Sequence, residues 1–399
     1  MTMLDLTAHF AKFRTAAPER INLAAHSHHD WPDVTFAAQE QCWLDAARLA
    51  GDKWNLVFGV LIPRVQMAIA RQLHLPDPST IAVGPNTHEF LRRLLSCFPS
   101  DRPTRILTSD AEFHTARRQL QRLEEDGLVI ATRVSAEPFD TFAERFHAAC
   151  AKGGHDLVFV SQVFFTSSAT SGNLETLVKA VPSPDTFVVI DGYHGFMARP
   201  TDLSAIADRV FYLAGGYKYA MAGEGCCFLH CPPGYGPRPR DTGWFADFGS
   251  LAGPFGKPVG YPEHGGRFLG ATFDPSGLYR LAAVFDWLAR ESITVEQIHL
   301  HARALMKRFL EGVKAMQIEG LSVSNLVTPF GTNAEHGNFL TFWTPRAGEI
   351  EAKLASVHVH SDHRGDRLRF GFGICTNSED VDQALARVGR VIATNSRKS

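Results

Sequence analysis

The sequence has almost no net charge and no long apolar run. Its 40 Lys and Arg residues against 42 Asp and Glu residues give a formal charge of −2 over 399 residues. This balance argues against a general nucleic-acid surface, and no basic run restores one, so we expect no nucleic-acid partner. Because no uninterrupted apolar stretch approaches the length of a membrane span, we expect no membrane partner.

Cysteine is also scarce, and its pattern excludes a disulfide framework. The seven cysteines are odd in number and irregularly spaced, which fits reduced thiols better than a secreted scaffold. The opening residues 1–20 contain Asp5 and Glu19 and lack an apolar segment, so they predict a short amphipathic helix rather than a targeting peptide. We therefore expect a cytoplasmic protein.

What the sequence does have is an ordinary globular composition, 45% hydrophobic and 21% charged, and a regular alternation of strand and helix patterns. Short β-branched or aromatic runs alternate with helical patterns, which is typical of a mainly parallel sheet. The predicted strands are 79–84, 105–109, 128–134, 156–162, 186–191, 209–215 and 226–231, and predicted helices among them are 87–98 and 141–152.

The composition of the sequence changes after Cys231. Residues 232–275 are rich in Gly and Pro and predict covering loops. Beyond them, helices at 276–292, 294–316 and 378–395 and strands at 338–343 and 367–373 predict a separate α+β layer. We expect a large α/β domain over 50–275, a small α+β domain over 276–399, and an N-terminal segment, 1–49, that joins the small domain and the active-site entrance.

One lysine stands out at the end of a predicted buried strand. "FYLAGGYKYAMAGEG" places Lys218 between two tyrosines, and "TFVVIDGYHG" ends the preceding strand with Asp191. Ligands of open α/β sheets gather at the carboxyl ends of the strands, so the two side chains could meet in one crevice. An amine that condenses with an aldehyde, beside a carboxylate that keeps a pyridine nitrogen protonated, is the minimum for pyridoxal-phosphate (PLP) chemistry. Either residue alone is more often an ordinary surface charge.

The two stretches that contain these residues resemble a known family. "VVIDGYHG" followed by "FYLAGGYKYAMAGEGCCFLH" is similar to the class V aminotransferase superfamily of PLP-dependent enzymes, and most closely to the kynureninases. Those enzymes carry a D-x-x-H pair followed by a G-Y-K-Y lysine motif. The resemblance can be followed in pieces from about residue 20 to 385, and it is specific in 191–225. It implies the PLP-dependent transferase fold of type I, with a mainly parallel mixed sheet flanked by helices in the large domain.

The resemblance implies roles for four catalytic residues. Lys218 is expected to form the Schiff base with PLP and to move the Cα proton of the substrate. Asp191 is expected to pair with the pyridine nitrogen, and His194 to support Asp191 or the ring hydroxyl side. Tyr217 is expected to contact the phosphate and to relay protons.

Further cofactor contacts are expected from two segments of the large domain. In "SDAEFHTARR", Phe113 matches the aromatic residue that stacks on the cofactor ring, and His114 is a second candidate. In "GPNTHEFLRRLL", Asn86 and Thr87 begin an amphipathic helix whose free N–H groups suit a phosphate. Taken alone this motif indicates an ordinary helix cap, but together with Lys218 and Asp191 it favours phosphate binding.

The family also brings phosphate ligands partly across a dimer interface. The matching residues are Trp244 in "DTGWFADFG" and Thr272 in "RFLGATFDP", with a lid plug as the alternative for the tryptophan. The resemblance therefore implies a homodimer whose active sites lie at the interface.

The substrate side is expected to bind an amino acid. In "GDRLRFGFGICTNSEDV", Arg369 matches the family arginine that holds the substrate carboxylate, and Arg367 lies on the same strand face as its main competitor. His26 and His28 in "LAAHSHHDWP" replace a G-N-S-L-G segment of the family, and we expect them to contact the substrate. Glu224 and Leu91 also depart from the kynureninase pattern, which puts kynurenine itself in doubt.

The His-x-His spacing supports a rival hypothesis, a metal-dependent amidohydrolase that uses His26 and His28. His358 and His360 repeat the spacing, but no matching His, His, Asp series follows either pair, so we expect no metal site. A scaffold without turnover is a third possibility, and it predicts a lost lysine or aspartate, whereas both are present.

Cys226, Cys227 and Cys231 fit a buried strand, and Cys375 is a thin candidate for a desulfurase nucleophile. The sequence thus predicts a PLP-dependent enzyme that acts on a small-molecule amino acid, either a kynureninase-like hydrolase or an aminotransferase of class V.

Overall fold

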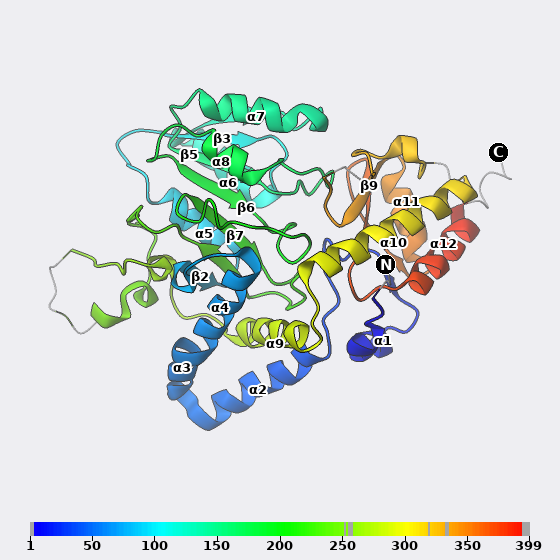
Figure 1. The fold of residues 1–399 in the computed structure, drawn as a ribbon, viewed down its shortest axis with the longest axis horizontal. Helices are drawn as coiled ribbons and strands as arrows, with labels where there is room; N and C mark the ends of the chain where they lie inside the picture. Colours follow the sequence, from blue (N-terminus) through cyan, green and yellow to red (C-terminus); the bar gives the residue numbers. More distant parts are fainter. Residues whose placement is uncertain (1–3, 251–252, 254–257, 318–319, 332–334, 393–399) are drawn as a thin grey trace.

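The computed structural model describes residues 4–250, 253, 258–317, 320–331 and 335–392. Figure 1 shows a large part built around one sheet and a smaller part built around α10, α11, α12 and β9, with α9 and α2 running side by side along one edge of the large part. The N-terminal helix α1 (Ala11–Ala16) lies near the smaller part.

The large part contains a seven-stranded sheet in the order β2-β8-β7-β6-β5-β3-β4. The five strands from β7 to β4 pair in parallel, whereas β8 runs antiparallel to both of its neighbours. The strands are β2 (Ile81–Gly84), β3 (Thr104–Ser109), β4 (Val129–Val134), β5 (Leu157–Ser161), β6 (Phe187–Asp191), β7 (Val210–Gly215) and β8 (Cys227–His230).

Helices cover both faces of this sheet because its strands are apolar on both faces. Alternate residues of β5 point to opposite sides: Val158 and Val160 join the core under α4, α7, α8 and α9, whereas Leu157 and Phe159 join the core under α5 and α6. The covering helices are α4 (Ile62–Leu73), α5 (Thr87–Leu95), α6 (His114–Glu125), α7 (Phe142–Ala151), α8 (Leu174–Lys179) and α9 (Ser276–Arg290).

The smaller part has its own core. Its antiparallel sheet has the order β11-β12-β9, and β1 pairs with β10 in a separate ladder. The elements are β1 (Ile21–Asn22), α10 (Val295–Met316), β9 (Phe339–Trp343), α11 (Ala347–Ala355), β10 (Val359–His360), β11 (Asp362–Arg364), β12 (Arg367–Gly371) and α12 (Ser378–Ile392). Ile21 and Leu23 belong to this core, whereas the apolar side chains of α9 belong to the core of the large part. The domain boundary at 276 stays a prediction.

The first long helical run is bent and packed. It comprises α2 (Val34–Leu49), η2 (Ala50–Asp52), α3 (Lys53–Leu56), the π-helical turn η3 (Val57–Leu61) and α4. By length and composition this run, Val34–Leu73, resembles a membrane span, which the sequence did not lead us to expect. Its buried side chains Val57, Val65 and Ile69 lie in the large core, and Asp45 inside it accepts a hydrogen bond from Tyr279 of α9. The run therefore packs against the large part through η3 and α4, and much of its remaining surface is exposed.

Short helical turns complete the described chain: η1 (Thr7–Phe10), η4 (Pro78–Thr80), η5 (Phe139–Thr141), η6 (Trp244–Ser250), η7 (Gly265–Phe268) and η8 (Val323–Asn325). All seven strands predicted in the large domain are confirmed within two residues at each end, and so are the two later strands predicted at 338–343 and 367–373. The end of the predicted helix 378–395 lies outside the described residues.

Candidate active site

The structure brings Asp191 and Lys218 to one edge of the sheet. β6 ends at Asp191, and its parallel neighbour β7 ends at Gly215, three residues before the lysine. The last residue of β7, Gly215, and the residue after it, Gly216, are both glycines because the space around them is filled. A Cβ on Gly215 would lie 2.2 Å from the hydroxyl of Tyr193 and 2.4 Å from the thiol of Cys227. The backbone can pass this point only as glycine.

Lys218 is buried, with 5% of its surface exposed. Its Nζ lies 2.7 Å from Nε2 of His194, while the other ring nitrogen of His194 is buried without a partner among the described residues. The rings of Tyr193, Tyr217 and Phe113 surround the amine, with their centroids 5.1, 5.5 and 5.5 Å from Nζ. An amine enclosed by apolar rings with so few hydrogen-bond partners is not a structural ion pair.

Burial controls the protonation of this cluster. It lowers the pKa of Lys218 to about 7, an effect that the carboxylate of Asp191 opposes. Burial also raises the pKa of Asp191. Two effects oppose this rise: the backbone N–H of Tyr193 donates a hydrogen bond to Asp191 Oδ1 at 2.9 Å, and the charge of Lys218 stabilises the carboxylate. Burial lowers the pKa of His194 well below its usual value, so the ring is neutral and accepts the hydrogen bond from Lys218. Lys218 can therefore exchange a proton near neutral pH.

A possible phosphate site lies at the start of α5. Asn86 caps the helix by accepting a hydrogen bond from the backbone N–H of Glu89 at 2.9 Å, so it serves as a cap, and Thr87 is the first helical residue. Burial raises the pKa of the neighbouring Cys227 thiol to about 12, although hydrogen bonds from Tyr193 and from the Thr87 backbone oppose this rise. The start of α5 and the Tyr193 hydroxyl thus both lie against the Cys227 thiol, and the free N–H groups of a helix N-terminus suit an anion.

A buried glutamate lies behind the predicted ring-stacking residue. Glu112, next to Phe113, accepts hydrogen bonds from the hydroxyls of Ser109 and Ser161, each at 2.5 Å, and from the Ser161 backbone at 3.2 Å. Ser161 is the register partner of Asp191 across β5 and β6. Burial raises the pKa of Glu112 to about 7, and the charge of Asp191 raises it further. This glutamate ties the Phe113 loop to the ends of β3 and β5.

The substrate-side residues form a second cluster, in the small domain. Arg369 on β12 is 2% exposed and lies opposite Asp362 of β11 in the strand register. Its Nε donates to Asp362 Oδ1 at 2.8 Å, its Nη2 donates to Asp362 Oδ2, and its Nη1 donates to the carbonyl of Phe165. His26 Nε2 lies 2.9 Å from the same carboxylate. Arg369 is near the site as predicted, but its donors are engaged by the protein itself.

Phe339 links the two clusters. The ring of His26 stacks on Phe339 with centroids 4.7 Å apart, and the ring of His194 lies 5.4 Å from the same phenylalanine. Burial lowers the pKa of His26 to about 4. The pKa of Asp362 stays low despite burial, because His26 and the guanidinium of Arg369 both donate hydrogen bonds to its carboxylate.

The remaining predicted contacts lie further out. His28 is exposed and stacks on Tyr217 at 5.2 Å, and His114 accepts a hydrogen bond from Arg117 at 3.2 Å and packs on Phe165. Trp244, 42% exposed, packs on the aromatic rings of η6, and Thr272 is exposed. Within the described part of one chain, no hydrogen bond, ion pair or ring contact joins either residue to the Lys218 cluster, so their roles across a dimer stay predictions.

Three rival interpretations of the sequence find no support in the described residues. These contain no group of three or more His, Cys, Asp or Glu side chains that could hold a metal ion. Arg367, the competitor of Arg369, is ion-paired with Glu137. Cys375 is buried, and burial raises the pKa of its thiol far above the usual range, so it is not an accessible nucleophile.

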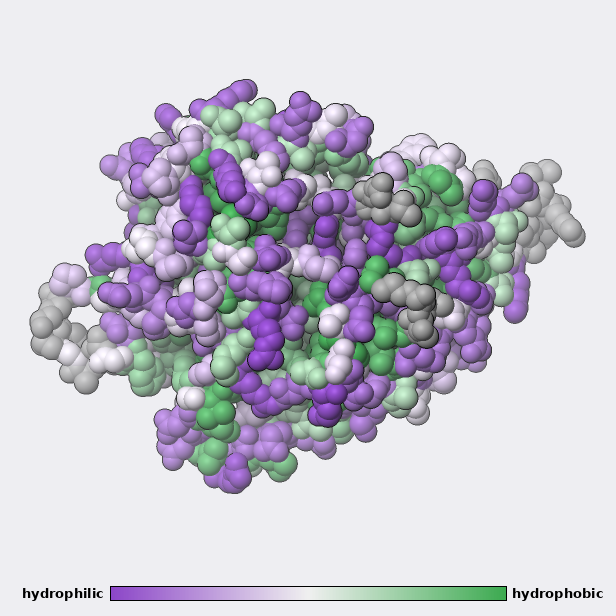
Figure 2. Space-filling view, viewed as in Figure 1, coloured by the Kyte–Doolittle hydropathy of each residue, from purple (hydrophilic) through white to green (hydrophobic). Residues whose placement is uncertain are grey.

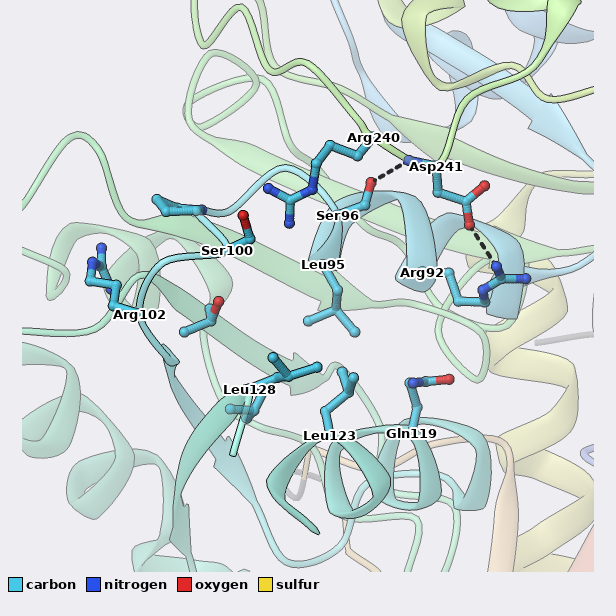
Figure 3. Close-up of a pocket in the computed structure, with 13 residues that line it drawn as sticks. Arg92, Leu95, Ser96, Ser100, Arg102, Gln119, Leu123, Leu128, Arg240 and Asp241 are labelled. Carbon is cyan, nitrogen blue, oxygen red and sulfur yellow. Dashed lines mark hydrogen bonds and ion pairs between the residues drawn. The ribbon is translucent and has the colours of Figure 1, made fainter. Parts of the chain in front are cut away.

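A cavity of about 350 Å³ lies at the opposite end of the strands. Thr104 and Val129, the first residues of β3 and β4, help to line it, whereas the Lys218 cluster lies at the strands' carboxyl ends. Figure 3 shows leucines on the α5, α6 and β4 sides and arginines around the rim, two of which pair with Asp241 and Asp156. The cavity shares no residue with the candidate active site.

Comparison with solved structures shows the fold. No family model and no curated protein sequence matches this chain. A mutant of C-DES, a cystine C–S lyase, with glycine covalently linked to its PLP cofactor superposes with a TM-score of 0.77 at 17% identity, over 97% of this chain and 100% of that one. The cysteine desulfurase of Thermococcus onnurineus NA1 gives 0.74 at 17% identity over 99% of both chains. The cysteine desulfurase CsdA of Escherichia coli gives 0.73 at 16% identity over 96% and 98%. The chain has the fold of these PLP-dependent enzymes, the type I fold predicted above.

Three residues of the site were missed by the sequence interpretation. Tyr193 stands inside the D-x-x-H motif and could have been found there. Glu112 is adjacent to Phe113, but nothing in its spacing shows that it is buried. Asp362 becomes visible only through the antiparallel register of β11 and β12, which places it opposite Arg369.

Proposed function

We propose that this chain is a PLP-dependent enzyme that acts on an amino acid. The observation that carries the proposal is the buried Lys218, whose amine faces His194 and interacts with Asp191 at the carboxyl ends of β6 and β7. When bound, PLP would withdraw electrons from the substrate Cα. The likeness of the fold to PLP-dependent desulfurases and lyases supports this proposal.

The residues present fit that cofactor. Lys218 would tether it, Asp191 would hold its ring nitrogen, and the unpaired ring nitrogen of His194 offers a further polar contact. The N–H groups at the start of α5 and the hydroxyl of Tyr193 would hold the phosphate, and Phe113 would cover one face of the ring. The low pKa of Lys218 would let its amine accept and return a proton near neutral pH.

Within this class, we propose a kynureninase-like hydrolase or a class V aminotransferase. The D-x-x-H and G-Y-K-Y motifs support the first, and Tyr217 beside the lysine would relay the protons that carbon–carbon cleavage requires. A C–S lyase is a second candidate, favoured by the likeness to C-DES. Transfer of sulfur to Cys375 is disfavoured because that thiol is buried and protonated.

We propose that the protein is a homodimer. Exposed apolar side chains continue from the long helical run onto η6, where Phe248 lies 6.1 Å from Phe58. Figure 2 shows hydrophobic surface at the lower edge of the molecule, where Figure 1 places α2 and α3. The exposed residues are Phe36, Trp43, Leu44, Val60, Met67, Trp244, Phe248 and Val259. Burial of this surface between two copies would also bring Trp244 to a partner's site.

The test is the absorbance of the purified protein after it has been loaded with PLP and freed of unbound PLP. The wild type is expected to bind PLP with a visible band that borohydride bleaches, whereas Lys218→Ala is expected to lose the bleachable band. Lys179→Ala is the matched control, because Lys179 is an exposed lysine of α8 paired with Glu175. Equal bleaching of all three proteins, or no binding by the wild type, would contradict the proposal.

A substrate panel then separates the reactions. Kynurenine and 3-hydroxykynurenine should yield alanine and an anthranilate if the enzyme is a hydrolase of this type. Conversion of the cofactor to its amine form indicates transamination, and release of sulfide or persulfide from cysteine or cystine indicates a lyase.

A further inference from the structure

The guanidinium expected to bind the substrate carboxylate is already occupied. Arg369 makes a two-point contact with Asp362, and its third nitrogen donates to the Phe165 carbonyl. This two-point contact is the same arrangement that a substrate carboxylate would make. The pair lies within electrostatic reach of Lys218, because both Arg369 and Asp362 affect its pKa.

We propose that Asp362 competes with the substrate carboxylate for Arg369, and that it transfers to Arg364 when the substrate carboxylate binds. This inference rests on the proposed function, because it assigns a specificity-determining residue within the same site. Asp362 is not itself a catalytic residue, since it acts through Arg369.

The fold fixes Asp362 in its competing position. Antiparallel pairing of β11 and β12 places Asp362 directly opposite Arg369, so the contact does not depend on a flexible loop. His26 provides a further hydrogen bond to the same carboxylate, and Phe339 packs against the His26 ring. A substrate carboxylate must therefore displace a contact that the sheet itself maintains.

Arg364 gives Asp362 an alternative partner. It lies two residues after Asp362 on β11, hence on the same face of the strand, and its Nη2 is 3.6 Å from Asp362 Oδ2. The side chain of Arg364 is 42% exposed, whereas that of Arg369 is 3% exposed. A rotation of Asp362 toward Arg364 would leave each carboxylate with one arginine, so no buried charge would lose its partner.

The consequence concerns which amines bind well. A free guanidinium fork strongly favours an amine that carries a carboxylate on the neighbouring carbon over the same amine without it. When Asp362 already occupies the guanidinium, this preference is weaker, because the substrate carboxylate replaces an existing contact of the same kind. Simple α-amino acids are therefore expected to bind little better than matched amines.

The experiment compares L-alanine with ethylamine, which is alanine without its carboxylate. Each is titrated into the PLP-loaded protein, and the absorbance change of the bound cofactor gives a dissociation constant. The wild type is expected to prefer alanine by less than about tenfold, because two hydrogen bonds to a free guanidinium would exceed that ratio. A larger preference in the wild type would overturn the proposal, and this measurement needs no variant to fold.

Variants test the exchange directly. Asp362→Asn is expected to tighten alanine binding by about tenfold or more and to leave ethylamine binding unchanged, since Arg369 loses its charged two-point partner and keeps at most a neutral hydrogen bond to the amide oxygen. Adding Arg369→Gln to that variant is expected to remove the gain. Asp382→Asn, which breaks an exposed two-point pair with Arg308, is the matched control and should change neither constant.

Two further outcomes distinguish failure of the proposed exchange from failure of the proposed function. A folded Asp362→Asn protein with unchanged or weaker alanine binding would overturn the exchange while leaving the proposed function intact. A wild type that binds no PLP would overturn both.

Discussion

Lys218 and Arg369 are both buried cations near the same edge of the sheet, but their surroundings differ. Lys218 faces a neutral imidazole and three aromatic rings, and burial lowers its pKa to about 7. Arg369 is surrounded by acceptors, with two contacts to a carboxylate and one to a carbonyl. The first cation is kept ready to change its protonation and bonding, whereas the second is stabilised by the protein itself.

This difference shows how one site can hold two kinds of charge. A lysine with a lowered pKa suits chemistry, since the neutral amine is the reactive form. A paired guanidinium suits structure, and it becomes a binding group only by exchange of its partner. The predictions below test each side of this comparison, beginning with the largest effect.

Asp191→Asn is expected to reduce turnover by about 10²–10⁴-fold, because the amide cannot keep the cofactor nitrogen protonated as a carboxylate does. Steady-state turnover on whichever amino acid proves to be the substrate measures this effect. Cofactor attachment to Lys218 should survive in this variant, and equal loss of attachment and turnover would instead indicate misfolding.

Asp362→Ala is expected to lower the free energy of unfolding by about 3–5 kcal/mol, since it leaves the buried Arg369 without its carboxylate. Asp382→Ala, which removes an exposed carboxylate from Arg308, is expected to cost less than about 1 kcal/mol. Denaturant unfolding of the cofactor-free proteins measures both. Equal decreases in the free energy of unfolding for the two variants would show that Arg369 has other partners sufficient to stabilise it.

Glu112→Gln is expected to change how stability depends on pH. In the wild type the folded pKa of about 7 exceeds the ordinary value of 4.5, so the folded state holds the proton longer and stability falls as pH rises from about 4.5 to about 7. The glutamine variant should lack this fall, a difference of about 1–3 kcal/mol at pH 7. Thermal unfolding of the cofactor-free proteins at pH 5 and pH 7 is the measurement; parallel curves for the two proteins would contradict it.

Cys375→Ser is expected to have the smallest effect, at most about twofold on turnover, because the buried thiol lies outside the chemistry. Assays with the proposed substrates and with cysteine measure it. Loss of sulfide release from cysteine in this variant alone would restore the desulfurase hypothesis.

The sequence predicted the large-domain cluster better than the small-domain cluster for a physical reason. Asp191 and Lys218 follow adjacent parallel strands, and strand ends are visible as breaks in apolar runs. Their meeting therefore follows from strand order alone. The pairing of Asp362 with Arg369 depends on an antiparallel register between two short strands, β11 and β12, which the pattern of side chains does not determine.

The same reason explains the other omissions. The side chain of Glu112 is buried because Ser109 and Ser161 converge on it from two strands. No local pattern in "SDAEFH" predicts this burial. The sequence predicted the same substrate role for His26 and His28, but the two side chains differ in burial. His26 is buried against Phe339, whereas His28 is exposed over Tyr217. Burial of neighbouring residues in a loop depends on tertiary packing.

The central claim is that Lys218 alone carries the cofactor. The most direct measurement is borohydride reduction of the PLP-loaded wild-type protein, followed by proteolysis and mass spectrometry of the peptides. The account predicts that the added mass lies on the peptide containing Lys218, at about one per chain, and that exposed lysines such as Lys179 remain unmodified. Adducts spread over surface lysines, or a single adduct on any other residue, would contradict it.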